Sequence, residues 1–381
     1  MYQLPLPKGG GGCGLININM KYLISGGGTG GHIFPAVSIA NALKQLDPEA
    51  DILFVGALGR MEMERVPQAG YRIVGLPVRG FNRARPWKNI SVLWDLWRSM
   101  RMAKKIIRDF RPDAAVGVGG YASGAAMKVA AKMHIPVILQ EQNGFAGVTN
   151  KLLKDDACLI CVAYENMERF FPKDKILLTG NPVRQNLTSG TRRKDGHPSV
   201  LVIGGSLGAR TINRAIEQGL NELKNTDVHL VWQTGKTYYA ECRKAWEEAG
   251  SPANIECLDF LSDMPDRYAQ ADIVVSRAGA SSISELCLLG KAAILIPSPN
   301  VAEDHQTHNA MALVRKDAAL MIKDAECADK LLPAILDMLA DEPRRSSMQT
   351  NILTLAQTDS ARRIADEVIK IAKNYRSTAK K

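Results

Sequence analysis

Short apolar runs alternate with longer amphipathic stretches along most of this chain. Between residues 20 and 180, seven apolar runs have the length of β-strands, at 22–25, 51–55, 72–76, 114–118, 137–140, 158–162 and 175–178. Segments of helical length separate them, the first ending near Leu46. This alternation is typical of a parallel sheet covered by helices on both faces.

The same pattern starts again after a polar stretch. Six more strand-length runs lie at 199–203, 228–232, 255–258, 272–276, 292–296 and 319–322, and a helix is predicted near 211–223. The sequence therefore predicts an α/β protein with two Rossmann-like domains that face each other across a deep cleft, where the carboxyl ends of both sheets meet.

Five segments follow from this pattern. A leader at 1–19, which carries four consecutive glycines, is expected to be disordered or the product of an upstream start. The first domain is expected at 20–180, a linker at 181–198 and the second domain at 199–358. The last segment, 359–381, is a helix with a basic tail that either domain can hold, including by packing back on the first.

A glycine-rich turn links the first strand to the first helix. It runs from Gly26 to His32, and Pro35 is expected at an early helical position. Free N–H groups and the positive end of a helix dipole bind anions, so this turn predicts a phosphorylated ligand, with His32 as its titratable group. Because Gly26, Gly28 and Gly31 also match G-x-G-x-x-G, a dinucleotide or a turn without a ligand stays open at this point.

Composition narrows the class of protein. The chain has 381 residues, 46% of them hydrophobic, and no apolar run as long as a membrane span. Seven cysteines without framework spacing indicate reduced thiols and a cytosolic setting, and Cys158-x-x-Cys161 is expected in a buried strand rather than in a metal site. The net charge of +10 favours anionic partners, of which nucleic acid fits least because no recognisable binding module is present.

Two further loops in the second half carry polar groups suited to a ligand. Small residues at 276–284 let a backbone approach phosphate, and Glu285 either binds sugar hydroxyls or forms a capping box with Ser282. At 303–310, a polar helix start explains the His305-x-x-His308 pair better than a metal does, with Asp304 as the cap and Gln306 left to bind a ligand. In the first half, the loops at 117–124 and 140–143 predict a second phosphorylated substrate.

Seven ordered motifs carry a resemblance to a known family. They lie at 27–32, 119–121, 141–143, 180–184, 204–210, 282–285 and 304–310. Together they closely resemble the bacterial MurG family, the undecaprenyl-diphospho-muramoylpentapeptide β-N-acetylglucosaminyltransferases of peptidoglycan synthesis. The resemblance extends over about residues 20–375 and implies the GT-B architecture.

The resemblance implies an enzyme and its substrates. The family transfers GlcNAc from UDP-GlcNAc to the C4 hydroxyl of the muramoyl sugar of lipid I, with inversion, to give lipid II. The donor-binding positions carried over are Thr29, Gly30, Gly31, Asn143, Arg184, Ser206, Leu261, Ala280, Ser281, Ser282, Ile283, Ser284, Glu285 and Gln306. The acceptor diphosphate is expected at Gly28, Gly30, Gly119, Gly120 and Tyr121.

The expected chemistry needs a base and a positive environment for departing UDP. His32 is the candidate base, and a histidine that only binds diphosphate or caps the helix is the alternative. No Asp-x-Asp sequence occurs, so transfer is expected to need neither metal nor another cofactor.

A basic, aromatic segment at 79–111 predicts membrane docking. It holds ten Lys or Arg residues against two acids, with tryptophans among them. Such segments sit at the surface of anionic membranes, and the alternative is a core helix with a solvated basic face. The residues expected at the membrane are Arg83, Arg85, Trp87, Lys88, Trp94 and Trp97. Together with this segment, the family resemblance implies a protein bound peripherally at the cytoplasmic face of the cell membrane, with other cell-wall synthesis proteins as further partners.

Three other functions remain open on the sequence. A dinucleotide oxidoreductase would use the first glycine turn only. A UDP-GlcNAc 2-epimerase would share the donor and the two-domain build. A non-catalytic nucleotide-sugar-binding protein would bind UDP-GlcNAc without turnover.

Overall fold

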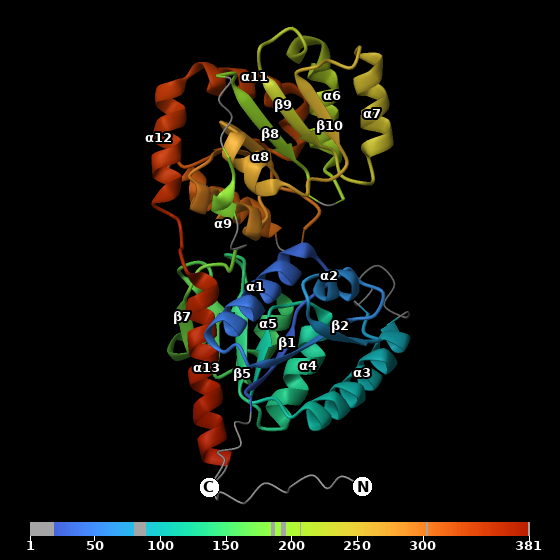
Figure 1. Ribbon diagram of the computed structural model, residues 1–381, viewed down its shortest axis with the longest axis vertical. Helices are drawn as coiled ribbons and strands as arrows, with labels where there is room; N and C mark the ends of the chain where they lie inside the picture. The colour runs from blue at the N-terminus through green and yellow to red at the C-terminus, as the bar shows by residue number, and fades with distance from the viewer. Residues whose placement is uncertain are drawn as a thin grey trace, which may run out of the picture.

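The computed structural model describes residues 19–79, 89–183, 187–191, 196–205, 207–301 and 304–379. They form two α/β lobes, one above the other in Figure 1, each built on a parallel sheet. The prediction of two parallel α/β units is confirmed. The leader residues 1–18, Arg184, Ser206, and the membrane candidates Arg83, Arg85, Trp87 and Lys88 lie outside the described residues.

The N-terminal lobe has a seven-stranded sheet in the order β3-β2-β1-β4-β5-β6-β7. Its strands are β1 (Lys21–Ser25), β2 (Asp51–Ala57), β3 (Arg72–Leu76), β4 (Ala114–Gly117), β5 (Val137–Glu141), β6 (Leu159–Val162) and β7 (Ile176–Leu178). Its helices are α1 (Gly30–Leu46), α2 (Glu62–Gln68), α3 (Asn89–Phe110), α4 (Tyr121–Lys132) and α5 (Val148–Leu153).

The C-terminal lobe has a six-stranded sheet in the order β10-β9-β8-β11-β12-β13. Its strands are β8 (Ser199–Ile203), β9 (His229–Gln233), β10 (Ile255–Leu258), β11 (Ile273–Ser276), β12 (Ala292–Leu295) and β13 (Leu320–Met321). Its helices are α6 (Arg210–Leu223), α7 (Tyr239–Glu248), α8 (Met264–Gln270), α9 (Ala280–Leu289), α10 (His305–Val314), α11 (Cys327–Ala340) and α12 (Glu342–Leu353).

Both sheets reverse their strand order at one point. The chain builds outward from β1 to β3 and returns to the other side of β1 with β4, and β8 to β10 and then β11 repeat this move. Ligands of open α/β sheets bind outside the carboxyl ends of the strands at such a switch point. The fold therefore places one such crevice in each lobe.

The central strands are covered on both faces. Along β1, Tyr22 and Ile24 pack in one core cluster with Ile39 of α1, whereas Leu23 packs in another with Ile107 of α3. This explains why the strand is continuously apolar instead of alternating. The short apolar runs of the sequence were therefore recognisable as buried parallel strands.

The C-terminal helix α13 (Ser360–Ala379) returns to the N-terminal lobe, as Figure 1 shows. Ile364 and Val368 lie in the same core cluster as Ile39 of α1. Arg376 forms an ion pair with Asp113, just before β4. The chain thus crosses between the lobes twice.

Two local predictions were wrong. Helix α1 begins at Gly30, so Pro35 is its sixth residue, because the chain leaves extended backbone at Thr29 and both following glycines are already helical. Cys161 is buried in β6, but Cys158 precedes the strand and is exposed, with its thiol donating to the carbonyl of Val137.

Among the described residues, no helix is long and apolar enough to cross a membrane.

Candidate active site

A cavity of about 1040 Å³ lies between the two lobes. The N-terminal lobe lines it with Gly30, Gly31, Phe34, Met61 and Arg65. Of the predicted donor residues, the cavity lining includes Gly30, Gly31, Leu261, Ala280, Ser281, Ser282, Glu285 and Gln306. Residues predicted from motifs up to 276 positions apart therefore meet at one site. This agrees with the expectation that the carboxyl ends of both sheets face the cleft.

Among the predicted donor residues that the structure describes, four do not line this cavity. Ile283 packs in the core of the C-terminal lobe and is 2% exposed. Ser284 is turned inward, where its hydroxyl donates to the carbonyl of Ala280 at 2.9 Å. Thr29 lies at the start of α1, and Asn143 lies in the loop after β5.

His32 lies in the first turn of α1. Its Nδ1 is hydrogen-bonded to Thr29 Oγ1 at 3.2 Å, and its ring lies against the backbone of Gly119. Burial lowers the pKa of His32 from 6.5 to about 4, while the carboxylate of Glu62 acts in the opposite direction. The imidazole is therefore neutral at pH 7 and able to accept a proton.

Glu62, the first residue of α2, is a site residue that sequence reasoning missed. Its side chain is fully buried, with Oε2 accepting from Gly28 N at 2.9 Å and Oε1 accepting from Ala57 N at 3.0 Å. The N–H of Gly28 is thus occupied by a carboxylate of the protein itself and is not among the free N–H groups that the turn was predicted to offer to an anion. In the sequence, an acidic residue at a helix start is only a common helix-terminal preference.

The second glycine turn packs directly on the first. Gly119 and Gly120 have φ values of +96° and +91°, and a Cβ on Gly120 would lie 2.5 Å from the carbonyl oxygen of Gly27. Tyr121 follows as the first residue of α4 and is 56% exposed. The predicted acceptor residues thus lie at the ends of the neighbouring strands β1 and β4.

Glu141 organises the loop after β5. It is 1% exposed and accepts from Gly147 N at 2.9 Å, Asn143 N at 3.1 Å and Asn150 Nδ2 at 2.9 Å. Burial raises the pKa of this carboxyl group. These bonds set the backbone of Asn143.

The two interpretations of Glu285 are separated by where α9 begins. Gly279 is the N-cap residue, so Ser282 is the third helical residue and cannot form the capping box. The Glu285 side chain is nearly buried, lines the cavity and accepts from the Tyr268 hydroxyl at 3.0 Å. A carboxylate held in this way is suited to bind sugar hydroxyls.

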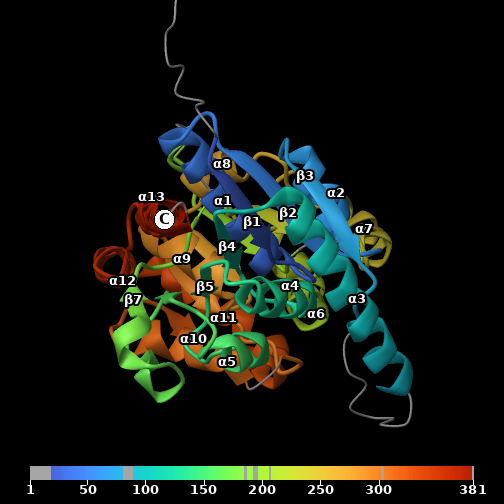
Figure 2. The same ribbon diagram turned by 90° about the horizontal axis from the view of Figure 1, so that it is seen from below.

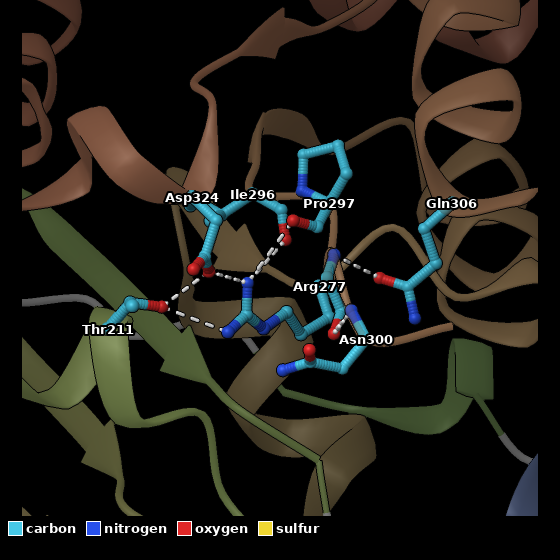
Figure 3. A network of polar contacts seen from close by, with 8 residues as sticks. Thr211, Arg277, Ile296, Pro297, Asn300, Gln306 and Asp324 are labelled. Carbon is cyan, nitrogen blue, oxygen red and sulfur yellow. Dashed lines mark hydrogen bonds and ion pairs between the residues drawn. The ribbon is translucent and has the colours of Figure 1, made fainter. Parts of the chain in front are cut away.

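Arg277, also missed from the sequence, joins the ends of three strands and the start of α6 beside the cavity (Figure 3). Its guanidinium forms an ion pair with Asp324, after β13, and donates to Thr211 Oγ1 of α6 at 2.9 Å. It also donates to the carbonyls of Ile296 and Pro297, after β12, at 3.2 and 3.3 Å. The five groups form one network at the carboxyl edge of the sheet.

The loop before α10 is held by Gln306, whose Oε1 accepts from Ser298 N at 2.9 Å, leaving its Nε2 for a ligand (Figure 3). Asp304 occupies the N-cap position with φ +47°, but its carboxylate accepts from Thr307 Oγ1 and not from the helix backbone. The predicted cap is therefore present only by position. His308 stacks near Phe145 of the other lobe, with ring centroids 6.3 Å apart.

Sequence comparison places both lobes in known domain families. Residues 22–158 match the glycosyltransferase family 28 N-terminal domain, and residues 199–368 match the glycosyltransferase family 28 C-terminal domain. A curated protein of Phocaeicola vulgatus is 56% identical over 94% of this chain and 98% of its own length. It is named a UDP-N-acetylglucosamine–N-acetylmuramyl-(pentapeptide) pyrophosphoryl-undecaprenol N-acetylglucosamine transferase.

Solved structures agree with this placement. The crystal structure of Acinetobacter baumannii MurG matches with a TM-score of 0.75 and 25% identity, over 92% of this chain and 99% of that one. A UDP-N-acetylglucosamine 2-epimerase matches with a TM-score of 0.64 at 14% identity, over 92% of this chain and 95% of that one. At that identity the likeness to the epimerase concerns the fold alone.

Proposed function

The chain belongs to glycosyltransferase family 28, and from this membership and the cavity between its lobes we infer the reaction that it catalyses. It transfers N-acetylglucosamine from UDP-N-acetylglucosamine to the C4 hydroxyl of the muramoyl sugar of lipid I, undecaprenyl-diphospho-MurNAc-pentapeptide, and so makes lipid II for peptidoglycan. The observation that carries this function is the 56% identity to a curated transferase over nearly the whole chain, motifs of both lobes included.

The donor is held mainly by the C-terminal lobe. UDP-GlcNAc is contacted by the cavity-lining residues of this lobe, which are Leu261, Ala280, Ser281, Ser282, Glu285 and Gln306, and Glu285 accepts from sugar hydroxyls. The N-termini of α6 and α9 both border the cavity, through Arg210 and Ala280. Two helix N-termini offer N–H groups and positive dipole ends to the diphosphate.

Transfer is inverting and uses His32 as the base. The neutral imidazole accepts the proton of the acceptor hydroxyl as that oxygen attacks the anomeric carbon, and UDP departs from the opposite face of the sugar. The helix dipoles and Arg277 stabilise the charge of the departing UDP without a metal ion. The low pKa of His32 keeps the imidazole neutral and its lone pair available, and it also makes the imidazole a weaker base than a histidine with its ordinary pKa.

The acceptor enters from a membrane surface. On α3, Trp94 and Trp97 are stacked 4.9 Å apart and 59% and 45% exposed, and the Arg101 guanidinium lies 4.3 Å from the Trp97 ring centroid. Figure 2 shows α3 at the edge of the molecule with one end reaching beyond the other elements. Exposed tryptophans beside cations support peripheral docking on anionic lipid, at the cytoplasmic face where UDP-GlcNAc is made available.

Transfer of radiolabelled GlcNAc to a lipid I analogue tests the function directly. The proposal expects label in lipid II only when the acceptor is present, and the same rate after treatment with EDTA. Conversion of UDP-GlcNAc to its C2 epimer in the absence of the acceptor would identify an epimerase instead. Binding of UDP-GlcNAc with no turnover in the presence of lipid I would identify a non-catalytic nucleotide-sugar-binding protein.

A further inference from the structure

Two buried asparagines join the same pair of segments across the cleft. Asn181, at the start of the linker, is 3% exposed, and Asn309, in α10, is 1% exposed. Each side-chain amide donates one hydrogen bond to residues 142–143 of the N-terminal lobe and one to residues 278–284 of the C-terminal lobe. The two contacts therefore form a double bridge between the loop after β5 and the turn that begins α9.

Asn309 connects Asn143 to the turn that begins α9, residues 278–284, which is called the donor turn from here on. Its Nδ2 donates to Asn143 Oδ1 at 3.4 Å and to the Ala278 carbonyl at 3.3 Å. Its Oδ1 accepts from Gly144 N at 3.3 Å, so all of its polar atoms are used across the interface. Because Asn143 Nδ2 also donates to Glu141 Oε1, the Asn143 side chain is oriented from both lobes.

Asn181 repeats this arrangement one step away. Its Nδ2 donates to the Gln142 carbonyl at 3.0 Å and to Ser284 Oγ at 3.1 Å. Its Oδ1 accepts from Gln140 Nε2 at 3.1 Å, within the end of β5. A buried amide satisfied at both ends specifies one geometry, because moving either segment leaves polar groups without partners.

We propose that Asn181 and Asn309 are positioning residues for the donor. They hold Asn143 of one lobe at a fixed position relative to the donor turn of the other lobe. The proposal rests on the function inferred above, in which the turn that begins α9 contacts UDP-GlcNAc, and on the role of Asn143 that the family resemblance implies, since Asn143 itself lies outside the cavity lining. UDP alone is held by the C-terminal lobe. The bridge thus raises the affinity for UDP-GlcNAc over that for UDP, because binding of the complete nucleotide sugar needs both lobes in the correct relative position.

Substitution of Asn309 by aspartate tests the hydrogen bonds of the bridge without changing the shape of the side chain. N309D keeps the shape of the side chain and the acceptor for Gly144 N, but a carboxylate cannot donate to Asn143 or Ala278. Losing two hydrogen bonds weakens UDP-GlcNAc binding by roughly tenfold, whereas UDP binding stays within about twofold of the wild type. Calorimetry with each nucleotide measures both, and N181D is expected to show the same pattern.

The double variant provides a sharper criterion. Because both amides join the same two segments, either one retains part of the register, so N181D/N309D is expected to weaken UDP-GlcNAc binding by more than the product of the single effects. Amide hydrogen exchange at Gly144, whose N–H is bonded to Asn309, is expected to speed up in N309S, which removes that acceptor. If aspartate variants fail to fold, N309S and N181S replace them in the calorimetry.

Asn213 provides the matched control. It is equally buried, donates to the Thr234 carbonyl at 2.9 Å and accepts from Trp232 Nε1 at 3.0 Å, all within the C-terminal lobe. N213D is expected to lower stability without changing the ratio of UDP-GlcNAc to UDP affinity. Equal weakening of both nucleotides in N309D, or no weakening of either, would overturn the proposal. Absence of transfer in a wild-type protein that binds UDP-GlcNAc would instead count against the proposed reaction.

Discussion

The imidazole of His32 rests on the bare backbone of Gly119: a Cβ placed on Gly119 would lie 2.6 Å from His32 Nε2. Gly119 follows β4, and His32 lies in the first turn of α1, which follows the neighbouring strand β1. The glycine therefore sets the position of the candidate base as well as the shape of the acceptor turn.

Replacing Gly119 by alanine is expected to abolish most transfer. The new methyl group displaces the His32 ring and also strains a backbone at φ +96°. A displacement of about 1 Å of a reacting group costs roughly 100-fold in rate, so kcat is expected to fall by that order. G124A, where a Cβ meets only the Thr149 methyl group at 3.3 Å, is the control and is expected to retain near-normal kcat. Equal activity in both variants would remove Gly119 from the site.

The pH profile of transfer reports the pKa of His32. Because the neutral imidazole is the active form and its pKa is lowered to about 4, kcat/KM is expected to stay level through neutral pH and to fall only as the pH drops toward 4. A histidine with its ordinary pKa would give an acid limb near 6.5.

The same shift has a consequence for stability. The unfolded chain binds the proton of His32 more readily than the folded one, so the stability contributed by His32 is complete above pH 6.5 and is lost as the pH falls toward 4. H32Q is expected to remove this part of the pH dependence and to abolish transfer with UDP binding intact. Near-normal turnover by H32Q would show that another group is the base.

Glu62 to glutamine is expected to loosen the first glycine turn. The amide replaces one of the two acceptor oxygens by a donor, which faces the N–H of Gly28 or Ala57 and leaves it without a partner. The free energy of unfolding is expected to fall by about 1–3 kcal/mol, the usual cost of a buried unsatisfied group. Urea unfolding measures it, with E64Q on the exposed face of the same helix as the control. Unchanged stability would mean that Glu62 does not hold the turn.

Arg277 to lysine is expected to weaken the C-terminal lobe. A single ammonium group cannot reproduce a guanidinium that reaches Asp324, Thr211 and two carbonyls together. Thermal unfolding is expected to show a loss of about 1–3 kcal/mol, with a raised KM for UDP-GlcNAc. R243K makes the same exchange in an exposed i,i+4 pair with Glu247, which lysine can still form, and is expected to change neither quantity. A raised KM with unchanged stability would assign Arg277 to ligand contact alone.

Replacing Trp94 and Trp97 together by serine is expected to weaken membrane binding. Both rings are exposed on α3, where they stack on each other and Arg101 lies over the Trp97 ring. Sedimentation with vesicles of anionic lipid is expected to show at least a roughly tenfold weaker affinity. L353S, an exposed apolar residue on the C-terminal lobe, is the control. Transfer to a water-soluble acceptor analogue is expected to remain.

Much of the fold was predictable because its signals are local. Each of the thirteen strands in the described residues corresponds to an apolar run of the sequence, shifted by at most one or two residues at its ends. Parallel strands buried on both faces are continuously apolar, so length and flanking glycines were sufficient. The site was located in the same way, since glycine turns at strand ends mark the carboxyl edge of a sheet.

The missed residues share one property: their partners are far away along the chain. Glu62 binds a backbone group 34 residues away, Arg277 pairs with a residue 47 away, and Asn309 reaches Asn143 across 166 residues. No periodicity or cap preference records such a contact. The position at which α9 begins also decided the role of Glu285. A helix capped by Ser282 would place Glu285 in a capping box, but the helix is capped three residues earlier, by Gly279, and Glu285 lines the cavity.

The sequence by itself determined the two α/β lobes, the order of their strands along the chain and the glycine turns that border the cleft, because apolar period and glycine conformational freedom act over a few neighbouring residues. Only the tertiary structure decided which N–H of the first turn is occupied, how Asn143 is oriented and that the pKa of His32 is lowered. Burial and hydrogen-bond partners control these properties, and both exist only once distant segments have packed together.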